Sequence, residues 1–160
     1  MGKDMTVQCD CGLITVRVGA IIQQRDKVLM VSNRNNDYFY SVGGRVKFGE
    51  TTEQAIVREV LEETGVKMDI DRLGFVHENY FYGDAPTNFG KLIYEISFYF
   101  YMKVPVDFVL TRNSFTENGR EEYLAWVLPS DINAKIYPVF FKTELKHHND
   151  HVQYFLTDER

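Results

Sequence analysis

The chain has 160 residues, of which 44% are hydrophobic and 26% are charged, as in a folded globular protein rather than a disordered one. We expect a single domain over residues 1–160 with one core of ordinary size. The net charge of −5 argues against binding of a nucleic acid polymer, and no apolar run approaches the roughly 20 residues that span a membrane.

The N-terminal segment carries both cysteines and no apolar core of a signal peptide. Cys9 and Cys11 are too few for a typical metal site and poorly spaced for a structural disulfide. We expect two reduced thiols near a flexible N-terminus and a cytoplasmic protein.

Extended segments joined by polar turns are predicted for the residues before the first helix. Apolar residues alternate with polar or small ones there, which is the pattern of a half-buried strand. In chain order these segments are a strand at Leu13–Ile22, a turn at Gln23–Asp26, a strand at Lys27–Ser32, a loop at Asn33–Asp37 and a short extended segment at Tyr38–Val42. Gly43 and Gly44 then break the pattern.

A helix is predicted at Thr51–Thr64. Thr51 can cap its first turn, with Gln54 three residues later as the reciprocal partner. Apolar residues recur inside the segment at helical spacing, and Gly65 fits a C-terminal stop.

The remaining sequence is predicted to be mostly strands. In chain order it contains a strand at Leu73–Tyr82, a loop at Asp84–Gly90, a long aromatic strand at Lys91–Val104, a polar loop at Thr111–Arg120, a strand at Glu121–Leu128, a helix at Pro138–Lys146 and a last strand at Val152–Leu156. This order predicts an α/β or α+β sandwich in which helices cover a mixed sheet.

Three glutamates give the predicted helix an acidic face. Glu59, Glu62 and Glu63 lie at i, i+3 and i+4, so their side chains share one side of the helix. Their repulsion costs a few tenths of a kcal/mol per pair, and a hard divalent cation such as Mg²⁺ would reverse that cost. The alternative is a solvated acidic face in which Arg58 and Glu62 form an ordinary ion pair.

Glycines stand immediately before this acidic helix. Gly43 and Gly44 end the extended segment, and Gly49 and Glu50 introduce the helix. Because glycine permits tight loops and close approach of the backbone to a bound group, the segment predicts a cradle for a metal ion and a diphosphate.

The stretch GRVKFGETTEQAIVREVLEETGV, Gly44–Val66, resembles the signature of the Nudix hydrolase family, which includes MutT-like proteins. That signature reads Gly, five residues, Glu, seven residues, Arg-Glu, an aliphatic residue, any residue, Glu-Glu, any residue, Gly and an aliphatic residue. Its fixed positions are filled by Gly44, Glu50, Arg58, Glu59, Val60, Glu62, Glu63, Gly65 and Val66. Val42 stands where many relatives have proline.

The resemblance implies a Nudix-type α/β/α sandwich with a mixed sheet, forming one Nudix hydrolase domain. It implies hydrolysis of a diphosphate linkage in a nucleoside diphosphate derivative or a related small molecule, with Mg²⁺ or alternatively Mn²⁺ as cofactor. Glu59, Glu62 and Glu63 correspond to the metal ligands, and Arg58 to the arginine that orients the carboxylates. Family members are often dimers, so a homodimer is a further expectation.

The general base that takes a proton from the attacking water is left open. Inside the signature, Glu59 and Glu63 are the catalytic candidates. Outside it, Glu121 and Glu122 lie shortly before Trp126, where the family often places an acidic residue. The alternative for both is a solvated strand end.

Substrate-binding candidates lie mainly outside the signature. Besides Gly43 and Gly44, these are Tyr38 and Phe39, which could stack on a base, and Tyr82, which lies near a position where some diadenosine polyphosphate hydrolases carry tyrosine. Packing within strands is the alternative for all three rings. The proline mark of ADP-ribose hydrolases and the motifs of NADH and coenzyme A hydrolases are absent, so the substrate stays open.

Two other functions are compatible with the same family resemblance. The first is a regulator that binds a nucleotide without cutting it, but such proteins often lose carboxylates of the signature, which are complete here. The second is an isomerase of isoprenoid diphosphates, which would need a core cysteine, and Cys9 and Cys11 are poorly placed for that role.

Overall fold

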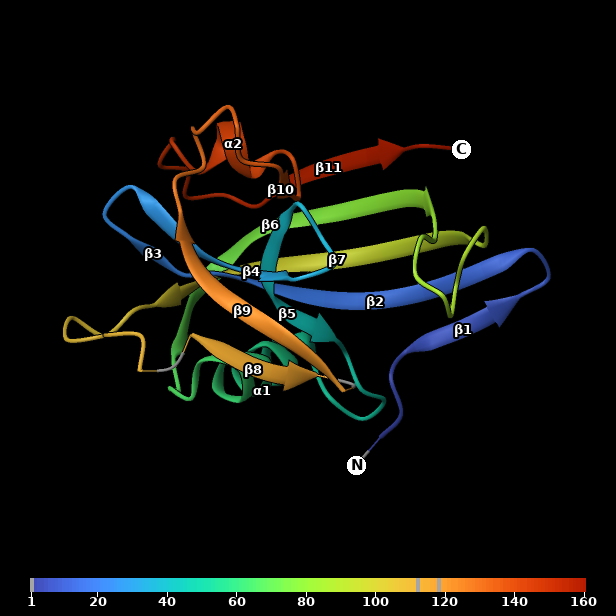
Figure 1. The fold of residues 1–160 in the computed structure, drawn as a ribbon, viewed down its shortest axis with the longest axis horizontal. Coiled ribbons are helices and arrows are strands. Elements are labelled where there is room, and N and C mark those ends of the chain that lie inside the picture. The colour runs from blue at the N-terminus through green and yellow to red at the C-terminus, as the bar shows by residue number, and fades with distance from the viewer. Residues whose placement is uncertain (1, 112, 118) are drawn as a thin grey trace.

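The structure is a computed structural model that describes residues 2–111, 113–117 and 119–160. Strands dominate it (Figure 1). The strands are β1 (Thr6–Cys9), β2 (Gly12–Ile21), β3 (Gln23–Gln24), β4 (Lys27–Asn33), β5 (Phe39–Arg45), β6 (Asp69–Tyr82), β7 (Leu92–Lys103), β8 (Ser114–Glu117), β9 (Arg120–Val127), β10 (Ile136–Tyr137) and β11 (Gln153–Asp158). The helices are α1 (Thr52–Thr64) and α2 (Phe141–Glu144).

The strands pair into one mixed sheet. Its order is β11-β6-β7-β2-β5-β4-β9-β8, with β1, β10 and β3 attached to β2, β5 and β4. The pairs β2–β7 and β6–β11 are parallel, whereas β2–β5, β4–β9 and β6–β7 are antiparallel. The predicted mixed sheet is confirmed.

Hydrophobic residues are buried on both faces of this sheet. Successive residues of a strand point to opposite faces, and in β7 Phe100 enters a first core while Tyr99 enters a second. Ile56 of α1 belongs to the first core, and Phe141 of α2 belongs to the second. In Figure 1 the two helices accordingly lie on opposite sides of the strands. This confirms the predicted α/β/α sandwich.

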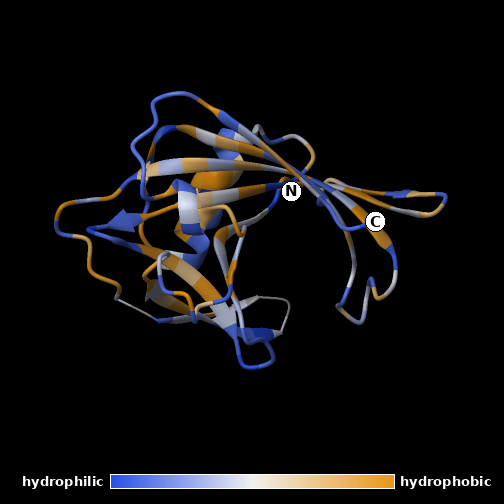
Figure 2. Ribbon diagram, turned by 90° about the horizontal axis from the view of Figure 1, so that it is seen from above, coloured by the Kyte–Doolittle hydropathy of each residue, from blue (hydrophilic) through white to orange (hydrophobic). Residues whose placement is uncertain are grey.

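The long central strands extend beyond the part of the sheet that the helices cover. Seen from above in Figure 2, their far ends run out to the right of the rest of the molecule. Aromatic side chains pair across this extension, where the rings of Tyr80 and Tyr94 stack with their centroids 4.5 Å apart. Tyr82, at the end of β6, is 55% exposed.

Helix α1 forms where the sequence predicts it. The Thr51 side chain accepts from the Gln54 backbone N–H, and the Gln54 side chain accepts from the Thr51 N–H, so the capping box is complete. Gly65 ends the helix in the left-handed conformation with φ of 76°, and its N–H donates to the Leu61 carbonyl.

The predicted break at the paired glycines is wrong, because β5 continues through them to Arg45. Gly43 pairs with Gly19 and Gly44 pairs with Val18 in the antiparallel β2–β5 ladder. Gly43 has φ of 144°, and a Cβ there would lie 2.1 Å from the Val18 carbonyl oxygen. Glycine here therefore permits close strand contact rather than ending the strand.

Short strands were missed where polar residues conceal the pattern. The predicted loop Thr111–Arg120 contains β8, although its residues 112 and 118 lie outside the described part. Phe115 of β8 packs against the first core, which one aromatic residue in a polar segment did not reveal. The turn predicted at Gln23–Asp26 likewise contains β3, and the N-terminal segment contains β1.

The predicted helix Pro138–Lys146 is much shorter in the structure. Helix α2 covers only Phe141–Glu144, and no side chain caps it. Aromatic packing fixes the segment instead, because the Phe140 ring stacks on Phe155 of β11 with centroids 4.3 Å apart. Long-range ring contacts of this kind are invisible to helical periodicity.

Both cysteines are exposed and neither forms a disulfide, as predicted. Cys9 lies in β1, which pairs with β2, rather than in a flexible segment. In the described part of the chain, no helix is both long and apolar enough to cross a bilayer.

His77 on β6 is expected to make stability depend on pH. It is 5% exposed, and burial lowers the pKa of its imidazole from 6.5 to about 4. Between these two values the unfolded chain binds a proton that the folded chain does not, so stability is lost as the pH falls from 6.5 towards 4. We expect a loss of about 1–3 kcal/mol, allowing for partial solvent screening.

Denaturant unfolding at several pH values checks this prediction. His77 bonds to the Thr157 hydroxyl at 2.9 Å, and His77→Gln keeps a polar group there that does not titrate. Its unfolding free energy should fall less between pH 7 and pH 4 than that of the unchanged protein. Equal falls in both proteins would contradict the assignment.

Candidate active site

The buried side of α1 brings two carboxylates against the glycines of β5. Glu59 is 6% exposed and Glu63 is 4% exposed. The Gly43 N–H donates to Glu63 Oε1 at 3.3 Å. A Cβ on Gly44 would lie 2.6 Å from Glu59 Oε1, closer than real Cβ atoms approach. Gly44 therefore lets the Glu59 carboxylate lie against the backbone, and the Gly43 N–H binds the Glu63 carboxylate.

Arg58 holds three carboxylates together around its guanidinium group. Its Nε and Nη2 donate to Glu50 at 2.5 and 2.9 Å, which is a bidentate pair. Its Nη1 donates to Glu59 at 2.6 Å and to Glu62 at 3.3 Å. The hydrogen bonds to Arg58 hold the pKa of Glu50 below its usual range and raise the pKa of Arg58.

The three predicted metal ligands differ in their surroundings. Glu59 and Glu63 are buried, whereas the Glu62 side chain is 52% exposed and turns to Arg58. Among residues 2–111, 113–117 and 119–160, no group of three or more His, Cys, Asp or Glu side chains is arranged to hold a metal ion. In this structure the Arg58 guanidinium contacts two of the three predicted ligands, Glu59 and Glu62.

The donor set nevertheless fits a hard divalent cation. Carboxylate oxygens are the ligands that Mg²⁺ accepts, and Glu59, Glu62 and Glu63 supply them from adjacent turns of one helix. Gly44 leaves space beside the Glu59 carboxylate that any side chain would fill. These three glutamates are therefore the residues that could hold the ion.

A further buried carboxylate enters the site from β9. Glu122 is 5% exposed, and the Tyr40 hydroxyl of β5 donates to its Oε2 at 2.5 Å. Burial and this hydrogen bond raise the pKa of Tyr40, and the negative charge of Glu63 contributes as well. Tyr40 thus lies between the carboxylate of β9 and the carboxylates of α1.

The structure does not bring Glu121 into this group. Its side chain is 52% exposed, accepts from the Tyr123 hydroxyl at 2.7 Å and lies 3.9 Å from the Arg34 guanidinium. Of the two candidates before Trp126, Glu122 is the inward one. The strand alternation could have shown this, because Leu124 and Trp126 of the same parity pack at the first core.

Only one of the predicted stacking rings lies by the carboxylates. The Tyr38 ring is half-buried, and its centroid lies 6.3 Å from that of Tyr40. Burial and the charges of Asp84 and Glu122 raise the pKa of Tyr38. Phe39 points to the opposite face and packs against the second core, so its predicted substrate contact is not supported.

Tyr82 is remote from the glycines. Gly44 is level with Val76 of β6 through the pairs Gly44–Val18, Val18–Phe98 and Phe98–Val76. Tyr82 follows Val76 by six residues, which is about 20 Å along a strand. The structure therefore does not bring Tyr82 to the site.

Sequence reasoning missed Tyr40 as a member of this site. Nothing in the neighbouring sequence identifies the partner of its hydroxyl group. Tyr40 and Glu122 are 82 positions apart in the sequence.

Comparison with known proteins identifies relatives of this chain. A family model described as the NUDIX domain matches residues 13–147. The chain is 44% identical over 54 residues to the ADP-ribose pyrophosphatase of Methanocaldococcus jannaschii, covering 32% of each protein. It is 31% identical over 61 residues to a MutT-like protein of Streptomyces ambofaciens, covering 38% of this chain and 40% of that one. The matches span less than half of these curated relatives.

A solved structure shows that the architecture is shared along most of the chain. The MutT protein from Bacillus halodurans superimposes with a TM-score of 0.64 and 18% identity, covering 91% of each chain. At this identity the likeness concerns the fold alone, and it confirms the predicted Nudix-type sandwich.

The contact between Gly44 and Glu59 gives a test of the site geometry. We expect Gly44→Ala to destabilise the fold by about 1–3 kcal/mol, because the new methyl group must displace the buried carboxylate. In a Glu59→Ala background the carboxylate is absent, so the same substitution should cost much less. Chemical denaturation of the four proteins measures this coupling. An equal cost in both backgrounds would show that the methyl group meets some other obstacle.

Proposed function

Because this chain belongs to the NUDIX domain family, whose model matches residues 13–147, we propose that it is a pyrophosphohydrolase that cuts a diphosphate linkage in a nucleotide derivative. One observation carries this proposal. Glu59 and Glu63 lie against the glycines of β5, Arg58 links Glu59 to the other signature carboxylates, and Glu122 and Tyr40 enter from the sheet. A regulator that only binds a nucleotide would not need so many acidic groups at one place.

Glu59, Glu62 and Glu63 are the proposed ligands of Mg²⁺, with Mn²⁺ as the alternative ion. The burial of two carboxylates on one helix face supports this assignment, because charge removed from water requires compensation. When bound, the ion would polarise phosphoryl oxygens and neutralise the negative charge of the diphosphate.

The chain's own residues would orient the groups and move the proton. Arg58 fixes the Glu59 carboxylate by a 2.6 Å hydrogen bond and is itself held by Glu50. Water attacks phosphorus, the new P–O bond forms as the bridging P–O bond breaks, and a carboxylate accepts the water proton. Glu122, rather than Glu121, is the proposed base among the residues outside the signature.

Tyr40 would position this base. Its hydroxyl binds one oxygen of Glu122, which leaves the second oxygen to receive a proton. Tyr38, at the same face, is the proposed stacking ring for the substrate. Because these residues recognise no particular nucleotide, the substrate is best sought with a panel that includes ADP-ribose, the compound in the name of the Methanocaldococcus relative.

The remaining features of the proposal concern the protein as a whole. One sheet includes strands from Thr6 to Asp158, which supports a single domain over residues 1–160. The net charge of −5 favours a small-molecule substrate over a nucleic acid polymer or an anionic membrane surface. A cytoplasmic location and a homodimer complete the proposal.

Substitution of the helix carboxylates tests the proposed reaction. We expect Glu59→Gln and Glu63→Gln each to reduce turnover by about 100-fold or more while the fold survives, because a neutral amide binds Mg²⁺ poorly. Release of phosphate or mononucleotide from the panel is measured with and without Mg²⁺, and omission of the metal should stop the reaction. Glu53→Gln is the matched control, since Glu53 is exposed in the first turn of the same helix. Near-normal activity in both active-site variants would refute the metal assignment, and no release from any compound would favour the regulator.

Substitution of two neighbouring glutamates tests which of them is the general base. We expect Glu122→Gln to lower kcat by about 100-fold or more and Glu121→Gln to leave it nearly unchanged, because only Glu122 faces the carboxylates. Steady-state kinetics at saturating Mg²⁺ measures both values. The reverse order of effects would assign the role to Glu121.

A further inference from the structure

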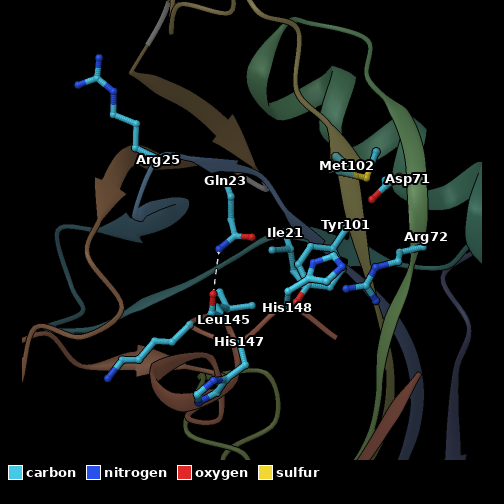
Figure 3. Close-up of a pocket in the computed structure, with 11 residues that line it drawn as sticks. Ile21, Gln23, Arg25, Asp71, Arg72, Tyr101, Met102, Leu145, His147 and His148 are labelled. Atoms are coloured by element: carbon cyan, nitrogen blue, oxygen red, sulfur yellow. Dashed lines mark hydrogen bonds between the residues drawn. The ribbon is translucent and has the colours of Figure 1, made fainter. Parts of the chain in front are cut away.

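A pocket distinct from the candidate active site lies mainly on the face of the sheet that α1 does not cover. Its volume is about 410 Å³, and β2, β3, β6, β7 and the segment after α2 surround it (Figure 3). Ile21, Tyr101 and Leu145 line it and contribute to the second core, whereas Met102, which also lines it, belongs to the first. No lining residue belongs to α1 or β5. The pocket is therefore separate from the proposed hydrolytic site.

Positive charge gathers in this pocket of an acidic protein. Arg25, Arg72 and Lys146 line it, and Asp71 is the only acidic residue among the lining side chains. His147 and His148 also line the pocket, and their imidazole rings can donate hydrogen bonds. The chain as a whole carries a net charge of −5, so this local excess of cations is opposite in sign to the rest.

Ion pairs do not account for these cations in the described part of the chain. Within the described ranges, Arg25, Arg72 and Lys146 take part in no ion pair, although the chain contains more acidic than basic residues. Their grouping around one cavity points to an anion from outside.

Arg72 is the best placed of the three. Its guanidinium carbon lies 4.1 Å from the centroid of the Tyr101 ring, so the group is stacked on an aromatic face. Figure 3 shows Arg72 turned inward, towards Tyr101 and His148. A stacked guanidinium keeps its N–H groups at its edge, where they can bind two oxygens of one anion.

Arg25 stands at the rim in an unusual backbone conformation. Its φ is 58°, and within the described part of the chain it is the only non-glycine residue with positive φ. Arg25 is the first residue of the two-residue turn between β3 and β4, a position at which a tight hairpin requires positive φ. In Figure 3 its side chain extends outward, and it is exposed, so it can turn towards an arriving anion.

We propose that this pocket binds a small phosphate-bearing molecule. A planar guanidinium with further cations at the rim matches the charge and the oxygen geometry of a phosphate group. The volume exceeds what a bare phosphate needs and lies within the range of small-ligand pockets, and the Tyr101 ring adds an apolar surface. The free phosphate ion and a phosphate monoester share this chemistry, and the experiment distinguishes them.

Calorimetric titration of the metal-free protein tests the proposal, in a phosphate-free buffer treated with a chelating resin. The probes are inorganic phosphate and AMP. We expect one binding event per chain for at least one probe, with affinity reduced about tenfold or more by Arg72→Ala. Asp71→Asn should strengthen binding, because it removes the only carboxylate of the pocket, and an effect of this sign would not follow from a merely structural role.

Control variants keep the result interpretable. Arg120→Ala removes an exposed arginine from β9 and should leave the affinity unchanged, as should Glu59→Gln in the proposed hydrolytic site. If Arg72→Ala fails to fold, Lys146→Ala at the exposed rim provides the second variant and should weaken binding. Binding of AMP alone identifies a phosphate monoester as ligand, and binding of phosphate alone identifies the free ion.

Two results would overturn the proposal. One is no binding of either probe, and the other is binding that persists unchanged in the Arg72→Ala and Lys146→Ala variants. Because the titration needs neither turnover nor a metal, its failure is distinct from a failure of the proposed hydrolysis.

Discussion

The direct contact between the carboxylates of α1 and the backbone of β5 governs the rest of the structure. Glu59 reaches the strand only because Gly44 carries no side chain, and Glu63 accepts from the Gly43 N–H. Burying two like charges on one helix face is unfavourable, and Arg58 offsets part of that cost through its shared guanidinium. The capping box and the left-handed Gly65 fix where the helix begins and ends, and so where these carboxylates fall.

Local patterns were sufficient where the cause of structure is local. The capping box, the helical spacing and the C-terminal glycine predicted α1 to within one residue, and the order of strands and helices predicted a mixed sheet covered by helices. The predicted break at the glycines failed because pairing with β2 decides the conformation of Gly43. Strand β8 and the short length of α2 were not predicted for the same reason. The positions of Phe115 and Phe140 depend on residues distant in the sequence.

The candidate site likewise contains residues that local sequence patterns predict and residues that they do not. The signature residues follow one another on a helix, so the sequence could place Arg58 and its neighbouring glutamates together. Tyr40 and Glu122 come close because β5 and β9 both pair with β4, on either side of it. The long Tyr40 side chain spans the distance across β4. The choice between Glu121 and Glu122 lay within reach of sequence reasoning, since it depends only on the parity of β9 with Leu124 and Trp126.

That parity makes the tight β8–β9 connection a determinant of chemistry as well as of shape. The pairs Glu117–Arg120 and Thr116–Glu121 fix the register of this hairpin around Gly119, whose φ is 76°. With the pairing at the turn kept, addition of one residue between Arg120 and Glu121 would present Glu121 to Tyr40, and loss of Glu121 would present Tyr123. The presence of two adjacent glutamates in the sequence would not reveal such a shift. The residue buried against Tyr40 would nevertheless change. Insertions and deletions in this turn are therefore a means by which related chains could lose or relocate an acidic group without any substitution in the helix.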